Sequence, residues 1–187
     1  MRITPMRIEG RGELLGLGSC PGRSVQSLDV VAGRQVLERD IRMVSSWRAK
    51  ALVTVLEDEE LKELKIEDVG ATATRAGIWW FRIPVKYDSA PDDRFRRAWP
   101  QVAPALLEML RLGQRVVLHD KDRDGRAGLV ACCILAELGL SAKDALRGLR
   151  AADKEVQLSP PHEMFVRQYL PHFPEHTRLR SGGPPSA

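Results

Sequence analysis

The stretch VVLHDKDRDGRAGLVACCILAEL, from Val116 to Leu138, decides how the rest of the sequence is interpreted. It opens with a β-branched run, continues into an Asp-x-Asp-x-Asp-Gly-Arg loop and ends in a long apolar segment. The β-branched run is typical of a buried strand, and the apolar segment is long enough for a core helix. The sequence therefore predicts a central strand over 116–119, a helix that starts near Gly125 or Arg126, and a highly charged loop between them.

Strands and helices are expected to alternate along the remaining chain. Further strands are predicted within 12–18, 50–57 and 78–85, one helix within 57–77, and other helices within 36–49, 94–113, 141–152 and 159–170. Pro100 and Pro104 should limit the first half of the helix within 94–113, because proline lacks the amide that a helix interior needs. This alternation predicts an α/β fold with a mostly parallel central sheet flanked by helices on both faces.

The composition fits one soluble globular domain. The chain has 187 residues, of which 43% are hydrophobic and 29% charged, with a net charge of +4. We expect an N-terminal arm or edge strand over 1–11, the domain over 12–175 and a disordered tail over 176–187. No run is long and apolar enough for a membrane span or a signal peptide, so we expect a cytoplasmic protein without a membrane partner. The basic stretches are short, so nucleic acid is not the expected partner, and the oligomeric state stays open.

Two interpretations of the charged loop depend on its aspartates. The three aspartates and the glycine match the first half of an EF-hand, but Ala131 stands where that loop needs a bidentate Glu. A strand that ends in Asp-x-Asp also resembles the first motif of the haloacid dehalogenase phosphatases, but Arg123 stands where they have Thr or Val. Both matches are incomplete, and no cofactor or metal is expected. A weak divalent-ion site is left open on Asp120, Asp122 and Asp124.

Two other interpretations depend on where the loop lies. Ligands of parallel sheets bind beyond the carboxyl ends of the strands, and the amides ahead of a helix N-terminus favour negative charge. Gly125 permits a tight turn, and Arg126 offers a two-pronged guanidinium to a phosphate group. The loop is therefore either an anion cradle or a plain solvated surface loop.

The sequence resembles the Cys-based dual-specificity protein phosphatases, and most of all their kinase-associated phosphatase group. Their signature is His-Cys, five residues and Arg after a buried strand, and His119, Asp120 and Arg126 fall on those three positions without a gap. LGLGSCPG (15–22), IWWFRIPVKYDSAPD (78–92) and the helical segments after the loop resemble the same group. The resemblance implies a protein-tyrosine-phosphatase-like fold. It also implies a phosphate-binding loop made of His119, Lys121, Asp122, Arg123, Asp124, Gly125 and Arg126.

The same resemblance shows that catalytic positions have changed. Asp120 stands at the position of the nucleophilic Cys, and Ala127 at that of the hydroxyl residue after the Arg. Tyr87 stands at the position of the general-acid Asp, with Asp88 one residue away. Cys132 and Cys133 lie on the predicted core helix. We expect them to be buried and unable to replace the missing nucleophile.

Several roles for Asp120 are compatible with this pattern. An ionised Asp120 would lie where a phosphate charge must go, and two unit charges ~4 Å apart repel by about 4 kcal/mol at an effective dielectric of ~20. As an internal anion, Asp120 would accept the loop amides and pair with Arg126; simple drift after a loss of activity explains it equally well. In an active enzyme Asp120 would be the nucleophile, Arg126 would bind phosphate and Asp88 would be the acid.

The sequence therefore leaves two function classes open. The favoured one is a catalytically impaired pseudophosphatase that acts as a binding or regulatory module, because two catalytic positions have changed together. The alternative is an active phosphomonoesterase that uses Asp120, with or without a divalent metal. A phosphorylated protein or another phosphate-bearing ligand is the expected partner in either case.

Overall fold

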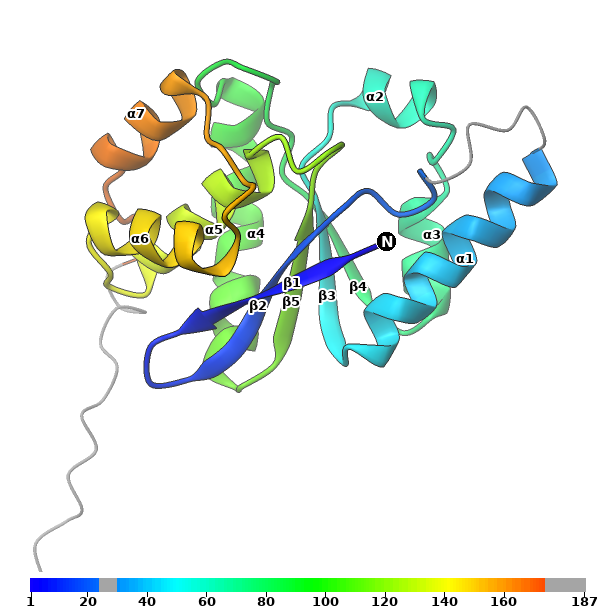
Figure 1. The fold of residues 1–187 in the computed structure, drawn as a ribbon, viewed down its shortest axis with the longest axis horizontal. Coiled ribbons are helices and arrows are strands. Elements are labelled where there is room, and N and C mark those ends of the chain that lie inside the picture. The colour runs from blue at the N-terminus through cyan, green and yellow to red at the C-terminus, as the bar shows by residue number, and fades with distance from the viewer. Residues whose placement is uncertain (24–29, 174–187) are drawn as a thin grey trace, which may run out of the picture.

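The computed structural model describes residues 1–23 and 30–173, so the tail predicted over 176–187 lies outside the described residues. A five-stranded sheet with the order β1-β2-β5-β3-β4 forms the centre of the molecule (Figure 1). Strand β1 pairs antiparallel with β2, and the other three pairings are parallel. The strands are β1 (Ile3–Ile8), β2 (Gly12–Gly18), β3 (Ala49–Thr54), β4 (Trp79–Arg82) and β5 (Arg115–His119).

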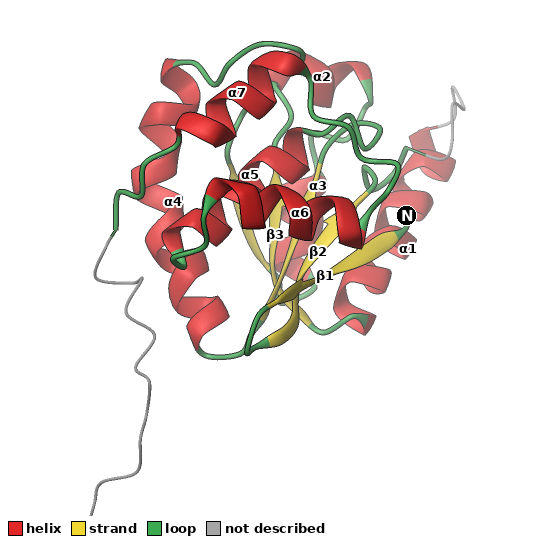
Figure 2. Ribbon diagram, turned by 60° about the vertical axis from the view of Figure 1, so that its left-hand side comes forward, coloured by secondary structure: helices red, strands yellow, loops and turns green. Residues whose placement is uncertain are grey.

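The described part of the chain has seven helices; six of them cover the two faces of this sheet, and α2 lies beyond the carboxyl ends of the strands. Helices α1 and α3 lie on one face, and α4 to α7 gather on the other (Figures 1 and 2). They are α1 (Val30–Ser46), α2 (Asp58–Glu63), α3 (Val69–Arg75), α4 (Asp93–Arg111), α5 (Arg126–Glu137), α6 (Ala142–Ala152) and α7 (Pro160–Gln168). None of them is long and apolar enough to cross a membrane. The α/β fold with a mostly parallel, two-sided sheet is confirmed.

The strand β5 and the helix α5 form the centre of this arrangement, as the opening stretch predicts. β5 lies between β2 and β3, and its last four residues are buried. Every residue of α5 is buried, including Cys132 and Cys133. Apolar residues cover all sides of this helix because sheet and helices surround it, which is the usual reason for a helix without a polar face.

Two helical predictions need correction. The segment 57–77 holds two short helices, α2 and α3, because Lys65 takes a left-handed φ of 54° and Ile66 turns into the core. The helix α4 runs unbroken through Pro100 and Pro104. Its apolar stripe is buried while Pro100 is exposed, so burial of the stripe outweighs the hydrogen bonds that the prolines cannot donate.

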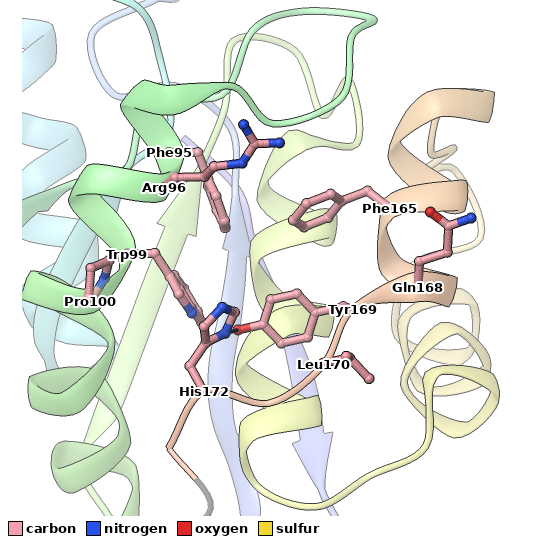
Figure 3. Close-up of a pocket in the computed structure, with 9 residues that line it drawn as sticks. All are labelled: Phe95, Arg96, Trp99, Pro100, Phe165, Gln168, Tyr169, Leu170 and His172. Carbon is pink, nitrogen blue, oxygen red and sulfur yellow. Dashed lines mark hydrogen bonds between the residues drawn. The ribbon is translucent and has the colours of Figure 1, made fainter.

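Aromatic side chains close the space between α4 and α7 (Figure 3). Phe95 and Trp99 project from α4 toward Phe165 and Tyr169, which come from α7 and the residue after it. The ring centroids of Phe95 and Phe165 are 5.6 Å apart, and those of Trp99 and Tyr169 are 6.3 Å apart, both edge-on. These rings line an apolar pocket of about 540 Å³ on the side of the molecule where the described chain ends.

A buried carboxylate fixes the end of the described chain against α5. Glu137 has no exposed surface, and it accepts hydrogen bonds from the Tyr169 hydroxyl and from the amides of His172 and Phe173. A buried polar group is tolerated when it is hydrogen-bonded in this way. Glu137 therefore holds the segment after α7 in place.

Candidate functional site

The charged loop joins the carboxyl end of β5 to the amino end of α5, and a glycine shapes the junction. Gly125 has a φ of 91°, a conformation that residues with a Cβ rarely adopt. A Cβ added at this position would lie 2.4 Å from the carbonyl oxygen of Gln157. Gly125 is therefore required both by its own backbone and by the segment that passes over it.

His119 is fully buried at the end of β5 and supports the loop from below. Its Nε2 atom lies 2.8 Å from the Oγ1 atom of Thr54, which also accepts a 2.9 Å hydrogen bond from the Trp80 indole. Burial lowers the pKa of His119 to about 4, so the imidazole is neutral at neutral pH. These contacts link the adjacent strands β3, β4 and β5. They suit a residue that positions the start of the charged loop.

Asp120 lies inside the cradle that the loop amides form. Its carboxylate is 1% exposed and accepts hydrogen bonds from the amides of Arg123 at 2.6 Å and Ala127 at 3.1 Å. Burial, together with the nearby charge of Asp124, raises the pKa of Asp120 to about 7, although the two amides act in the opposite direction. The Asp120 carboxylate thus takes two of the amides of its own loop.

Arg126 is also fully buried, and carboxylates surround its guanidinium. Nη1 and Nη2 donate to Glu60 at 2.6 and 2.8 Å, while Nε and Nη2 donate to Asp124 at 3.0 and 2.7 Å. Nη1 also donates to the carbonyl of Val85 at 3.0 Å. These contacts use all five N–H donors that a guanidinium has. The pairing of Arg126 with Asp120, which the sequence left open as one role of Asp120, is not formed: Asp124 and Glu60 pair with Arg126 instead.

Glu60 is a site residue that the sequence analysis missed. It belongs to the capping box of α2, where it accepts a 3.0 Å hydrogen bond from the Glu57 amide. Burial raises the pKa of Glu60, but hydrogen bonds from Arg126 and Glu57 outweigh it and hold the pKa below its usual range. The capping-box motif is visible in the sequence, but nothing there links it to an arginine in another element.

The remaining loop residues turn outward and pair with other segments. Lys121 lies 3.6 Å from Glu63, and Asp122 pairs with Arg23. Arg123 pairs with Asp153 and Glu155, which precede α7. The structure thus brings together Asp120, Asp124 and Arg126, and it directs Lys121, Asp122 and Arg123 away from them.

Tyr87 and Asp88, where the sequence analysis looked for a general acid, lie in the segment next to Arg126. The Tyr87 ring centroid is 5.8 Å from the Arg126 guanidinium carbon, within the range of a cation–π contact, and the side chain is largely exposed. Asp88 is exposed and has a left-handed φ of 51°. His162, which the sequence analysis did not single out, is buried beneath this segment with Nε2 3.3 Å from the Lys86 carbonyl.

The loop aspartates do not form a metal site together. Asp120 faces the loop amides, Asp122 faces Arg23 and Asp124 faces Arg126. Across the residues that the structure describes, no group of three His, Cys, Asp or Glu side chains is arranged to hold a metal ion. The donor set therefore does not fit the divalent ion that the sequence left open.

Comparisons with solved structures identify known proteins with a similar fold. No family model and no curated protein matches the sequence. The structure is similar to kinase-associated phosphatase with its catalytic cysteine changed to serine, with a TM-score of 0.74, 18% identity and coverage of 88% of this chain and 91% of the other. It is also similar to the active form of Tk-PTP (TM-score 0.63, 21% identity, 92% and 97% covered). A protein tyrosine phosphatase from Leishmania major is similar as well, with a TM-score of 0.65, 16% identity and coverage of 90% of this chain and 99% of the other. The chain therefore has the fold of the protein-tyrosine and dual-specificity phosphatases.

Proposed function

We propose that this chain is a pseudophosphatase: a binding or regulatory module on a phosphatase fold, without thiol-based catalysis. The observation that carries the proposal is the state of Arg126, whose guanidinium is hydrogen-bonded on every side by Asp124, Glu60 and Val85. A phosphate bound by Arg126 needs two parallel N–H donors on one edge of the guanidinium. Asp124 already takes that edge, so a phosphate group has to displace it.

The chemistry of position 120 supports the same proposal. A thiolate is the nucleophile of the enzymes that this fold resembles, and here the position carries a carboxyl group. The Asp120 carboxylate is hydrogen-bonded to two amides, which lowers its reactivity toward phosphorus. Beside Asp124, an ionised Asp120 also repels an incoming phosphate group. A phosphate-bearing partner would therefore have to be recognised without Arg126.

The first test is an assay for phosphomonoesterase activity. Wild type should not hydrolyse an aryl phosphate or a phosphotyrosine peptide, with or without magnesium, and vanadate should change nothing. The control is Asp120→Ala, purified in parallel. Turnover by wild type that disappears in Asp120→Ala would make Asp120 a working nucleophile and overturn the pseudophosphatase proposal.

The second test asks whether Asp124 is the internal occupant of the anion site. Asp124→Ala should free the Nε–Nη2 edge of Arg126 and strengthen tungstate binding about tenfold or more, since a charge-assisted bidentate contact becomes available. Asp122→Ala is the matched control, because it removes a carboxylate from the same loop on the outward side. Calorimetry measures both affinities.

The gain in Asp124→Ala should vanish when Arg126→Lys is added, because lysine lacks the two-pronged edge. Equal tungstate affinity in wild type, Asp124→Ala and Asp122→Ala would show that Asp124 does not block the site.

A further inference from the structure

A basic pocket lies at the other end of the sheet from the charged loop. It has a volume of about 690 Å³ and opens between the amino ends of β3 and β5, at the lower edge of the sheet in Figure 1. Three cationic side chains line it: Arg48, Lys50 and Arg115. Leu14 forms an apolar part of the wall, and Gln114 adds an amide group. Among the residues that the structure describes, no carboxylate lines the pocket.

The charges in this pocket differ from those at the loop. Arg126 is fully paired, whereas Arg48 and Lys50 form no ion pair with any residue that the structure describes. Within the described part of the chain, the Arg115 guanidinium donates one hydrogen bond, from Nη1 to the carbonyl of Trp47 at 2.9 Å, which leaves its other N–H groups available. Unpaired cations gathered in a concave site raise the local concentration of anions.

The local backbone gathers these cations. Arg48 has a left-handed φ of 58°, which is uncommon for a residue with a long side chain. Lys50 is the extra residue of a bulge, because Ala49 pairs with Arg115 and Ala51 with the next residue of β5. Bulges change the direction of a side chain and occur next to functional sites.

Arg115 is held in place by a second contact. Its guanidinium carbon lies 5.1 Å from the centroid of the Trp47 ring, in addition to the hydrogen bond to the Trp47 carbonyl. A guanidinium fixed in this way loses less conformational entropy when it binds an anion.

We propose that this pocket binds a small organic phosphate. The forked guanidinium groups of Arg48 and Arg115 match phosphate oxygens, and Lys50 adds a compact positive charge. The pocket is open to solvent, and its volume exceeds what one phosphate group fills. Leu14 and Gln114 are placed to contact the organic part. The proposal does not depend on the state of Arg126 or on the proposed function.

The test is calorimetric titration of the full chain with ribose 5-phosphate, inorganic phosphate and ribose at constant ionic strength. Ribose 5-phosphate should bind more tightly than inorganic phosphate, and ribose should not bind. The double variant Arg48→Gln/Lys50→Gln should weaken binding of ribose 5-phosphate about tenfold or more. Its control is Arg97→Gln/Lys143→Gln, which removes the same charge from exposed positions outside the pocket.

Three outcomes would overturn the proposal. Failure of wild type to bind any of the phosphates excludes the site. An equal loss in the control double variant means that overall charge, and not this pocket, attracts the anion. Full binding in Arg48→Gln/Lys50→Gln that is lost when Arg126→Lys is added places the ligand at the charged loop instead.

Discussion

Asp120 combines two properties that usually exclude one another. It lies among amides that stabilise a negative charge, yet burial and Asp124 favour the neutral acid strongly enough to raise the pKa of Asp120 to about 7. The neutral and ionised forms are therefore close in energy near neutral pH. Protonation of this one group decides how much negative charge the buried site carries.

Replacement of Asp120 should change how stability depends on pH. The unfolded chain ionises this carboxyl near its ordinary pKa of 3.8, whereas the folded chain keeps its proton until about pH 7. The stabilisation from this group is therefore complete below pH ~4 and is lost as the pH rises toward ~7, at up to about 1.4 kcal/mol per pH unit. Urea unfolding at several pH values should show this slope in wild type relative to Asp120→Asn.

The difference between wild type and variant is the informative quantity in that experiment. His119, whose pKa is lowered to about 4 by burial, destabilises the fold as the pH falls below ~6.5, but it does so in both proteins. Asp122→Asn, an exposed change in the same loop, should leave the slope of wild type intact. Parallel curves for wild type and Asp120→Asn would show that Asp120 titrates normally.

At the scale of elements, the junction between β5 and α5 depends on Gly125. Gly125→Ala should destabilise the fold by about 3 kcal/mol or more, because it adds a left-handed backbone cost of about 1–2 kcal/mol and a Cβ that clashes with the Gln157 carbonyl. Gly77→Ala is the control: Gly77 has a similar φ of 75°, but nothing lies within 4 Å of its added Cβ. Denaturant unfolding measures both changes.

Gly77→Ala should cost only the backbone part, about 1–2 kcal/mol. Equal losses for Gly77→Ala and Gly125→Ala would show that the contact with the Gln157 carbonyl does not constrain the loop.

The strand–loop–helix unit was predictable because its signals are local. A β-branched run, a charged turn with glycine and a long apolar segment determine β5, the loop and α5 without reference to other residues. The helix α4 was also predicted with nearly its observed bounds; only the limit expected at Pro100 and Pro104 was wrong, because tertiary burial outweighs the local effect of these prolines.

The site was predictable only in part, for the same reason. The loop sequence identifies Asp120, Asp124 and Arg126 as charged neighbours, but it does not say which carboxylate the guanidinium takes. That choice depends on where α2 brings Glu60 and on how the loop directs Asp120 toward its own amides. These are long-range side-chain contacts, and no periodicity or spacing reports them.

At the scale of the whole molecule, the cations of the charged loop and those of the basic pocket differ in their ion pairs. The chain carries a net charge of +4, but the cations at the loop are neutralised by carboxylates from α2, the loop and the segment before α7. At the opposite end, Arg48 and Lys50 form no ion pair with residues in the described ranges 1–23 and 30–173. Binding to small anions, if it follows free charge, is therefore expected away from the phosphatase-like loop.

The three cysteines lie in the two hydrophobic cores, one on each face of the sheet. Cys20 packs in the core on the side of α1 and α3, while Cys132 and Cys133 pack in the core on the side of α4 to α7. Burial raises the pKa of Cys20 and of Cys132 to about 12, so neither is a reactive thiolate at neutral pH.

An aromatic disulfide reagent should therefore label none of the three cysteines quickly in the native protein. In urea, all three should become reactive together, at the midpoint at which the helical signal is lost, because one cooperative transition opens both cores. Cys20→Ser, which leaves only the thiols of α5, should show the same midpoint by both measurements. Labelling of Cys20 well below that midpoint would mean that the α1 face opens on its own, and the two cores would then not unfold as one unit.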